Sequence, residues 1–483
     1  MRTLVAGVDC STHATKIVVV DADTGEAVSS ARTQHPVRES EGIRETHPDA
    51  WWQALISALR QTNLAPEIAA ISVAGQQHGL VCLDEAGEPL RPAMLWNDTR
   101  AASDAAELVD AFGGASRWAA RIGVVPVASF TASKWAWLRR REPAIAARTA
   151  AIRLPHDFVT EKLCGEGVTD RGDASGTAWW SNETEAYSPE VLALPSIRLT
   201  EDRLPRVLGA TEQAGVVTAA AAAQTGLPVG AVVGPGTGDN MGAALGLGLR
   251  PGVPVLSLGT SGTVYLVSET RSADPTGDVA GFADAAGRFL PLACTLNCTY
   301  AVDRMAGWLN IDRENVVPSG GVVVLPYLDG ERTPNLPDAS GAVFGLRHTT
   351  DPRAILMAAY EGAIVGLLDA LQAIDVCSSG VDKDAPLILV GGGAHGATWQ
   401  SVAQRLSGRS IAIPRVREVV SMGAAVQAAA VLRHESPLDV ATRWGTAAGT
   451  LLPAVPRDNE TISVVRSVRH LATAALQVGR PRS

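Results

Sequence analysis

Cysteine is scarce in this sequence and forms no recognisable pattern. The 483 residues include six cysteines, and only Cys294 and Cys298 lie close together. No second pair of Cys or His residues stands at the spacing of a zinc site, so a zinc module is not predicted. We expect free, reduced thiols that are mostly buried.

The sequence also lacks the segments that direct a chain into a membrane. It opens on a strand-like run, residues 4–8, without the charged region, apolar stretch and cleavage site of a signal peptide. No apolar run approaches the ~18–20 residues that a spanning helix needs. We therefore expect a cytoplasmic protein with no membrane partner.

Basic residues are in the minority, and a common phosphate-binding motif is missing. The net charge is −9, which disfavours the broad basic surface that binds nucleic acid, so no nucleic-acid partner is expected. The G-x-x-x-x-G-K-[ST] pattern of P-loop enzymes does not occur. An anionic ligand stays open, because helix N-termini and glycine turns bind phosphate locally.

The residues that are present favour two large, well-packed domains. Apolar residues make up 46% of the chain and charged residues 19%, which supports sizeable cores. Soluble domains usually have ~100–250 residues, so a chain of this length predicts two. Clustered Gly and Pro residues near 244–254 indicate the boundary, which gives domains at 1–246 and 247–483.

Two short units of similar plan support this division. Residues 4–8 and 16–20 are apolar runs that flank a small, hydroxyl-rich loop, and residues 255–258 and 264–267 repeat this pattern about half the chain later. Elsewhere, helix-like stretches alternate with apolar strands, which predicts an α/β architecture.

A glycine-rich turn at residues 391–396 lies between an apolar strand and a predicted helix. Its sequence, Gly-Gly-Gly-Ala-His-Gly, matches G-x-G-x-x-G, and such turns let backbone amides approach a phosphate. A dinucleotide site would carry an acidic residue at the end of the next strand, where Pro414 and Arg415 stand instead. A nucleotide-contacting turn is favoured, and a dinucleotide site or a plain tight turn are the alternatives.

Phosphoryl transfer without a P-loop still needs phosphate-holding groups, Mg²⁺ and a carboxylate that orients or deprotonates the acceptor hydroxyl. Asp239 follows a short apolar strand and a glycine-rich turn, where α/β sheets present their ligands; a helix cap is the alternative. Asp9 closes the first strand and suits Mg²⁺, directly or through water, or else forms a turn. Thr260 and Ser261 suit a phosphate or an ordinary hairpin turn.

A dense set of polar and aromatic residues follows another apolar run. Gln77 and His78 lie between glycines, and Trp96 begins the sequence Trp-Asn-Asp-Thr-Arg. Sugar pockets need such mixtures, because each desolvated hydroxyl must keep its hydrogen bonds. A structural His78 is the alternative reading of this segment.

At these residues the chain resembles the FGGY carbohydrate kinases, and among them the members that act on xylulose. The likeness runs from about residue 5 to residue 432 through several motifs in the same order. These are residues 72–79, 95–100, 130–134, 169–177, 238–240, 257–263, 325–334 and 391–396.

The resemblance implies two RNase H-like, actin-like ATPase domains with a cleft between them. The sugar, the first phosphate loop and the catalytic Asp would belong to the N-terminal domain, and ATP mainly to the C-terminal one. Asp239 would be the general base, and Asp9 the acid linked to Mg²⁺ and required for activity. Sugar-binding positions would be Gln77, His78, Trp96 and Asn240. Nucleotide-binding positions would be Ser11, Thr12, Thr260, Ser261, Gly392, Gly393 and Gln400.

Two departures from the family pattern matter for the site. The first loop usually reads Asp-x-Gly-Thr, but here Ser11 replaces the glycine and restricts the backbone at the phosphate-facing turn. The pair before the sugar is often Met-His, and here it is Gln77-His78. The amide of Gln77 adds a donor and an acceptor that bear on which sugar hydroxyl is recognised.

The expected reaction is the ATP- and Mg²⁺-dependent conversion of D-xylulose to D-xylulose 5-phosphate. The alternatives are another sugar or polyol (ribulose, a hexulose or gluconate), a catalytically silent actin-like sugar sensor, and a dinucleotide oxidoreductase. The presence of both carboxylates and both phosphate turns argues against the sensor. The sequence leaves the oligomeric state open, with a homodimer as the assembly to test.

Overall fold

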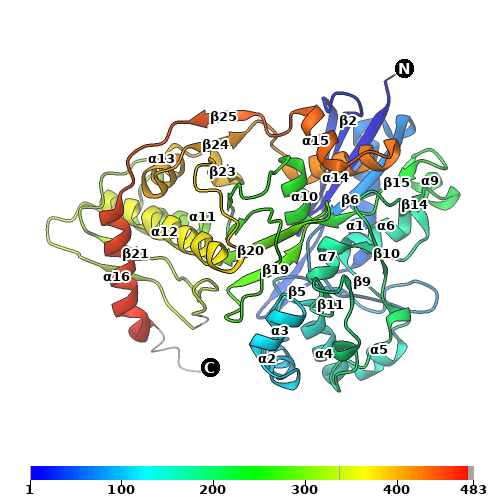
Figure 1. Ribbon diagram of the computed structural model, residues 1–483, viewed down its shortest axis with the longest axis horizontal. Coiled ribbons are helices and arrows are strands. Elements are labelled where there is room, and N and C mark those ends of the chain that lie inside the picture. The colour runs from blue at the N-terminus through cyan, green and yellow to red at the C-terminus, as the bar shows by residue number, and fades with distance from the viewer. Residues whose placement is uncertain (1, 337, 477–483) are drawn as a thin grey trace.

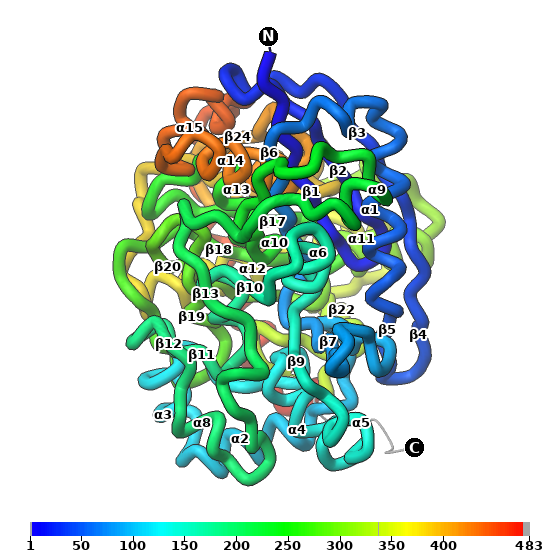
Figure 2. The backbone as a smooth tube through the Cα atoms, turned by 90° about the vertical axis from the view of Figure 1, so that its right-hand side faces the viewer, coloured from blue at the N-terminus to red at the C-terminus, as the bar shows by residue number. Residues whose placement is uncertain are grey.

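The computed structural model describes residues 2–336 and 338–476 of the chain. In this part, two seven-stranded sheets, one from each half of the sequence, form the centres of two lobes that lie side by side (Figure 1). Turning the molecule by 90° brings the N-terminal lobe to the front, with the second lobe behind it (Figure 2). The expectation of an α/β protein with two large units is confirmed.

The first sheet has the strand order β14-β15-β6-β1-β2-β3, and β16 also pairs with β6. β1 runs antiparallel to β2 and parallel to β6. The strands are β1 (Leu4–Cys10), β2 (Ala14–Asp21), β3 (Ala27–Gln34), β6 (Ile68–Gly75), β14 (Gly215–Val216), β15 (Val232–Val233) and β16 (Thr237–Gly238).

The second sheet has the order β19-β20-β18-β17-β23-β24-β25. β17 runs antiparallel to β18 and parallel to β23, so its centre repeats the plan of the first sheet. The prediction of two related units is confirmed by this repetition. The strands are β17 (Val255–Leu258), β18 (Gly262–Tyr265), β19 (Val279–Ala283), β20 (Phe289–Thr295), β23 (Leu387–Val390), β24 (Ile411–Pro414) and β25 (Gly449–Leu452).

Short strands pair outside the two large sheets. They are β4 (Arg38–Ser40), β5 (Ile43–Thr46), β7 (Val81–Leu83), β8 (Ala93–Met94), β9 (Ala151–Arg153), β10 (Val168–Asp170), β11 (Trp180–Ser181), β12 (Ala186–Tyr187), β13 (Arg206–Leu208), β21 (Val323–Leu325) and β22 (Ala342–Phe344). The helices in the first half of the chain are α1 (Pro48–Thr62), η1 (Ala65–Glu67), α2 (Ala102–Ala111), α3 (Ala115–Arg121), α4 (Thr131–Arg141), α5 (Pro143–Arg148), α6 (Pro155–Cys164), α7 (Arg171–Ser175), α8 (Pro189–Leu192), η2 (Glu201–Arg203), α9 (Ala219–Thr225) and α10 (Asp239–Gly246). The helices in the second half are α11 (Thr299–Leu309), α12 (Pro352–Ser378), η3 (Gly392–His395), α13 (Ala397–Ser407), α14 (Val419–Arg433), α15 (Pro437–Trp444) and α16 (Asn459–Leu476).

Helix α14 crosses from the second half of the chain to the first sheet. It packs against α10, β1 and β6, although the predicted boundary at 246/247 assigns it to the C-terminal domain. The approach is close enough to require glycine: a Cβ atom on Gly7 of β1 would lie 1.8 Å from the carbonyl oxygen of Ser421, and one on Gly423 would lie 1.8 Å from that of Gly242. The two predicted domains are therefore interlocked through α14.

Helix α12 corrects one expectation from the sequence. By length and composition it is apolar enough to cross a membrane, so the prediction that no apolar stretch approaches the length of a spanning helix is wrong. Its four acidic or basic residues are spread over 27 positions and leave an apolar window between them. In that window 83% of the residues are buried inside the protein, as in a core helix.

The cysteines behave as expected. All six are free, and five of them are buried, with Cys377 half-buried. Burial raises the pKa of the thiols of Cys10, Cys82, Cys294 and Cys298, which keeps them protonated near neutral pH.

Candidate active site

The parallel strands of the first sheet bring three polar segments to one edge. Cys10 at the end of β1 lies opposite Gly75 at the end of β6, and Gly238 at the end of β16 lies opposite the same Gly75. Since parallel strands end at the same edge, Asp9, the Gln77-His78 pair and Asp239 converge there. In the second sheet, Ser257 pairs with Val390, so the turns at 259–261 and 391–393 share an edge as well.

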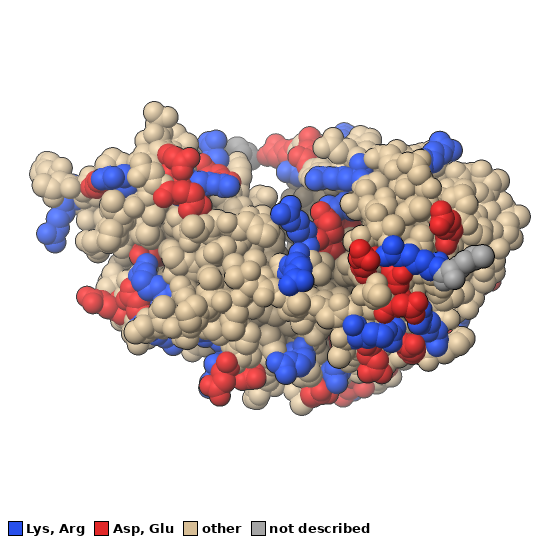
Figure 3. Space-filling model, turned by 90° about the horizontal axis from the view of Figure 1, so that it is seen from above, with Lys and Arg blue, Asp and Glu red and all other residues tan. Residues whose placement is uncertain are grey.

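A cavity of about 240 Å³ joins groups from both halves of the chain. The first lobe contributes Asp9, Lys16, Asp239 and Asn240 to its lining, and the rest of the chain contributes Ser257, Tyr265, Val390, Gly391 and the segment 417–420. On the face seen from above, the space-filling view shows a hollow between the two lobes with Lys and Arg side chains at its rim (Figure 3).

Asp239 is the first residue of α10, and Gly238 before it is the N-cap. Its Oδ1 accepts hydrogen bonds from the backbone amide of Asn240 at 2.8 Å and from Asn240 Nδ2 at 2.9 Å. Burial, followed by the negative charges of Asp9 and Asp173, raises the pKa of the carboxyl to about 7. A carboxyl that titrates near neutral pH suits general-base chemistry.

The turn before Asp239 is held from a distant part of the chain. Gln427 of α14 is fully buried and donates from Nε2 to the carbonyl of Gly236 at 2.9 Å. Its Oε1 accepts from Ser72 Oγ at 2.6 Å. No local pattern in the sequence signals this contact, because the residues lie about 190 and 355 positions apart.

Asp9 is buried and has two partners. Ser11 Oγ donates to its Oδ1 at 2.6 Å, and Lys16 Nζ lies 3.2 Å from its Oδ2. Lys16 also pairs with Glu418 at 2.9 Å. Burial raises the pKa of Asp9, and Lys16 opposes that rise. Lys16 was missed in the sequence, although the predicted hairpin places it directly opposite Asp9.

The backbone at position 11 accommodates a serine where the family pattern usually has glycine. Ser11 is not one of the described residues with a positive φ, so the backbone at this position does not need the conformational freedom that only glycine has. Its carbonyl accepts from His35 Nε2 at 3.2 Å and from Gln76 Nε2 at 3.4 Å. The serine thus adds a hydroxyl that orients Asp9.

Gln77 presents an unused donor. Its Oε1 accepts from Asn240 Nδ2 at 3.0 Å, which links the predicted sugar-binding segment to the residue after Asp239. Its Nε2 is buried and has no hydrogen-bond partner among the described residues. Since buried donors are almost always paired, this amide fits a ligand with an acceptor such as a sugar oxygen.

His78 is held rigidly beside this amide. Its Nδ1 lies 2.7 Å from the carbonyl oxygen of Gly176, and its ring lies between Phe130 and Phe282, at centroid distances of 4.9 and 5.6 Å. Burial, followed by the charge of Lys134, lowers the pKa of His78 to about 3. The ring is therefore neutral, with Nδ1–H as donor to the carbonyl and Nε2 as an acceptor.

The predicted nucleotide residue Thr12 lies beside the predicted sugar residue Trp96. Trp96 Nε1 donates to Thr12 Oγ1 at 3.0 Å, so the indole N–H already has a partner. What remains available at this position is the half-buried indole ring and the second lone pair of the hydroxyl.

The glycine turn of the second sheet combines tight packing with an open position. A Cβ atom on Gly391 (φ +86°) or on Gly393 would lie 2.8 Å from atoms of Leu258, whereas one on Gly392 would meet nothing within 4 Å. Gln400 Nε2 donates to the carbonyl of Ala394 at 2.8 Å and so braces this turn.

Thr260 and Ser261 occupy the neighbouring turn, after β17. Thr260 is exposed and Ser261 half-buried, and neither hydroxyl bonds to another of the described residues. The carbonyl of Thr260 accepts from the amides of Cys298 and Tyr300 at 3.2 and 3.4 Å, which fixes the turn against the start of α11.

Tyr265 lines the cavity and was not predicted. Its hydroxyl is buried without a partner in the described part of the chain, and burial raises its pKa. It offers a neutral donor that faces the same space as Asp239.

The donor set fits Mg²⁺ bound together with a phosphate ligand. Across residues 2–336 and 338–476, no group of three or more His, Cys, Asp or Glu side chains stands ready to hold a metal. Mg²⁺ commonly uses only one or two carboxylates and completes its shell with water and substrate phosphates. Asp9 and Asp239, on one cavity wall, supply that number of carboxylates.

A buried charged cluster lies behind the site. His156 is fully buried; its Nδ1 lies 2.7 Å from Asp173 Oδ2, and its Nε2 lies 3.2 Å from Asp157 Oδ1. Despite burial, the neighbouring carboxylates raise the pKa of His156 to about 9. Glycine allows this ring to lie beneath the site, because a Cβ on Gly236 would be 2.4 Å from it.

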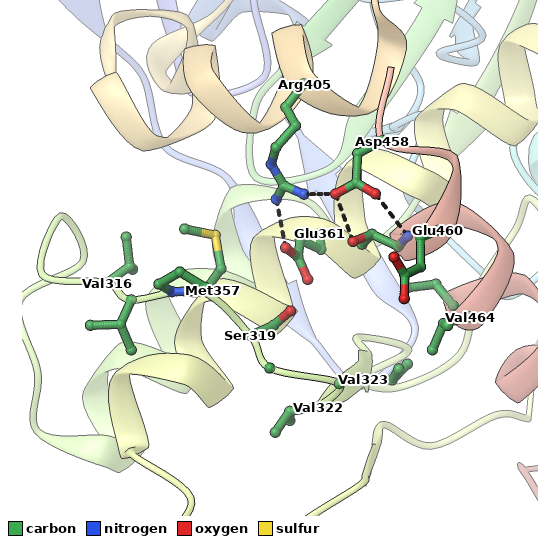
Figure 4. A pocket seen from close by; sticks show the side chains of 16 residues that line it. Val316, Ser319, Val322, Val323, Met357, Glu361, Arg405, Asp458, Glu460 and Val464 are labelled. Atoms are coloured by element: carbon green, nitrogen blue, oxygen red, sulfur yellow. Dashed lines mark hydrogen bonds and ion pairs between the residues drawn. The ribbon is translucent and has the colours of Figure 1, made fainter. Parts of the chain in front are cut away.

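A second cavity, of about 410 Å³, lies elsewhere in the C-terminal lobe, between α12, α16 and the loop 316–323. Figure 4 shows Arg405 between Glu361 and Asp458, so these three charged groups are paired with one another. None of the predicted site residues lines it. The smaller interlobe cavity is the candidate site, because its lining combines Asp9 and Asp239 with Gly391 of the glycine turn in the second sheet.

The duplicated sheets and the carboxylates between them define a two-domain, actin-like phosphotransferase. Comparison with known proteins agrees. The chain belongs to the FGGY family of carbohydrate kinases: the model of the family's N-terminal domain matches residues 4–246, and that of the C-terminal domain matches residues 255–432. The alternative of a dinucleotide oxidoreductase is therefore wrong.

Two relatives are similar over nearly their whole length. A xylulose kinase from Streptomyces coelicolor is 56% identical over 477 residues, covering 98% of this chain and 97% of its own. A xylulose kinase from Streptomyces rubiginosus is 54% identical, covering 99% and 98%.

Solved structures agree in fold. The crystal structure of xylulose kinase from Bifidobacterium adolescentis matches with a TM-score of 0.84 at 33% identity, covering 97% of this chain and 99% of that one. A gluconate kinase from Lactobacillus acidophilus matches with a TM-score of 0.89 at 19% identity, covering 99% of both. The fold is thus shared by kinases of different sugars.

Proposed function

We propose that this chain transfers the terminal phosphoryl group of ATP to D-xylulose and forms D-xylulose 5-phosphate. The observation that carries the proposal is the identity above 50%, along nearly the whole chain, to two relatives named xylulose kinase. The neutral His78 and the amide Nε2 of Gln77, which has no partner among the described residues, support it, because a ketose needs both acceptors and donors in its pocket.

Asp239 is the general base in this proposal. Its carboxylate takes the proton of the sugar's terminal hydroxyl while that oxygen attacks the phosphorus in line. Gln77, His78 and Asn240 hold the sugar, with the ring of Trp96 beside them. Domain closure would exclude water and so limit futile hydrolysis of ATP.

The nucleotide belongs to the turns of the second sheet, at Thr260, Ser261, Gly392 and Gly393, with Gln400 bracing the last two. Ser11 and Thr12 face them from the first sheet. Asp9 would hold Mg²⁺, directly or through water, and the ion when bound neutralises phosphate charge. Division at 246/247 into a sugar-binding and a nucleotide-binding domain, a cytoplasmic location and a homodimeric assembly complete the proposal.

The experiment that tests the function is a phosphorylation assay over a panel of sugars. D-Xylulose should give the highest kcat/KM, and ribulose, hexuloses, gluconate and polyols lower values. A higher value with another member of the panel would overturn the assignment of the sugar. If no sugar of the panel stimulates ATP consumption, the result favours the silent sensor instead.

Turnover should depend on pH through Asp239. Because the pKa of this carboxyl is raised to about 7, it is protonated and inactive as a base at lower pH. We expect kcat at saturating sugar to rise between about pH 6 and pH 8 and then to level off. The coupling system is checked with added ADP at each pH, and a kcat that is flat across this interval would contradict the assignment.

Gly392→Ala should weaken ATP binding without disturbing the fold. The added methyl group meets no protein atom within 4 Å and points into open space beside the turn. If phosphate oxygens approach the backbone there, KM for ATP rises by about tenfold or more. Gly209→Ala, which also meets nothing within 4 Å, serves as the matched control and should leave KM unchanged.

A further inference from the structure

The backbone of His78 adopts a conformation that is uncommon for a residue with a side chain. Its φ is +66°, in the left-handed region. Such a conformation costs free energy and persists where the surroundings hold it in place. The contacts of the His78 carbonyl therefore identify what holds the imidazole in the candidate sugar pocket.

Two donors from the first turn of α4 meet on that carbonyl. Lys134 Nζ donates to the oxygen of His78 at 2.8 Å, and Thr131 Oγ1 donates to it at 3.3 Å. Lys134 Nζ also donates to the carbonyl of Ser129. The ammonium group thus joins the loop that carries His78 to the segment leading into α4.

Burying the side chain of Lys134 carries a large desolvation cost. The residue is fully buried, and its ammonium group forms no ion pair with a carboxylate of the described residues. Burial lowers the pKa of Lys134 to about 7. An apolar side chain of similar length would avoid this desolvation cost, so the two carbonyls that Lys134 holds account for a lysine here.

The segments that carry His78 and Ser129 also contact the second lobe. Arg332 Nη1 donates to Ser129 Oγ at 3.5 Å, and the ring of Phe282, from β19, lies against that of His78. The second lobe therefore reaches the candidate sugar pocket at the segment that Lys134 fastens.

We propose that Lys134 is a positioning residue of the sugar pocket, which fixes the backbone of His78 so that the acceptor Nε2 faces the ketose. The proposal rests on the proposed function, since that assigns the sugar to Gln77 and His78. Lys134 itself touches no substrate. Its two hydrogen bonds set the place of the imidazole, and Thr131 contributes the weaker third bond.

The test is a comparison of kinetic constants in Lys134→Met. We expect KM for D-xylulose to rise by about tenfold or more while KM for ATP stays within about twofold of wild type. A residue needed only for folding would lower the amount of active enzyme and so the apparent kcat, with KM for the sugar unchanged. Unchanged KM for the sugar in a folded variant overturns the proposal.

A second pair of variants keeps the test decisive if Lys134→Met does not fold. Thr131→Val has almost the same shape and removes one donor to the His78 carbonyl, whereas Thr131→Ser keeps it. Thr131→Val should raise KM for the sugar by a few-fold, and Thr131→Ser should not. Equal constants in the two variants contradict the positioning role.

A spectroscopic measurement separates this proposal from the proposed function. Wild type that phosphorylates no sugar of the panel overturns the function. The positioning role is then read from the imidazole nitrogen signals of His78 by NMR, assigned with His78→Asn. Lys134→Met should shift these signals, and unshifted signals overturn the positioning role whatever the substrate.

Discussion

Asp239→Asn is expected to lower kcat by about 10²- to 10⁴-fold, the range that a general base contributes. The amide keeps the shape of the carboxylate and its contact with Asn240, but it cannot take the proton of the sugar hydroxyl. Steady-state kinetics at saturating ATP and D-xylulose measure the effect. This is the largest effect on catalysis that the site predicts.

Sugar binding should survive the same substitution. Gln77, His78 and the side chain of Asn240 remain in place, so the dissociation constant for D-xylulose, measured by calorimetry without ATP, should change by less than about threefold. Asp49→Asn, on the first turn of α1 and away from the cavity, is the control for the chemical change alone. If the turnover of Asp239→Asn is close to that of wild type, Asp239 is not the general base.

His156→Gln should cause the largest loss of stability, about 3–5 kcal/mol in the free energy of unfolding. His156 contacts Asp173 and Asp157, with Asp170 4.0 Å away, and all four residues are buried. Removing the imidazolium leaves carboxylates buried without their counter-charge. Urea unfolding followed by fluorescence measures the loss.

The pH dependence gives this prediction a sign. The raised pKa of His156, about 9, means that its contribution to stability is present in full below its ordinary pKa of about 6.5 and is lost as pH rises through about 9. Wild type should therefore lose stability between pH 7 and pH 9 more steeply than His156→Gln.

The control for His156 is a histidine on the surface. His13 has a side chain that is 63% exposed, and among the described residues its ion-pair partner is the exposed Glu39. His13→Gln should change stability by less than about 0.5 kcal/mol. A change of that small size in His156→Gln would show that the buried cluster contributes nothing to the fold.

Local sequence patterns predicted most elements that frame the site. The apolar runs at 4–8 and 255–258 became β1 and β17, each followed by a polar turn and an antiparallel strand. Strand ends and glycine turns also indicated Asp9, Asp239 and the turn at 391–396. These features are readable because the backbone period, the turn residues and the ends of strands are properties of neighbouring residues.

Contacts between distant segments left no such trace. Gln427 holds the turn before Asp239, Phe282 and Arg332 reach the His78 segment, and Lys134 bonds to a carbonyl 56 residues away. The apolar window of α12 gave no sign of whether protein or lipid would cover it; only packing answered that. Tertiary contacts of this kind depend on the whole fold, not on local composition.

Sequence and tertiary structure determine different properties of the site. The sequence by itself determined the types of chemical group present: two carboxylates at strand ends, a Gln-His pair and two small-residue turns. The tertiary structure alone decided their properties. Asp239 titrates near pH 7 because burial and the charge of Asp9, 230 positions away in the chain, act on it together, and His78 is neutral because burial and Lys134 disfavour its charge. Solvent exclusion and electrostatic fields arise only when distant segments pack together, which is why no local pattern could reveal them.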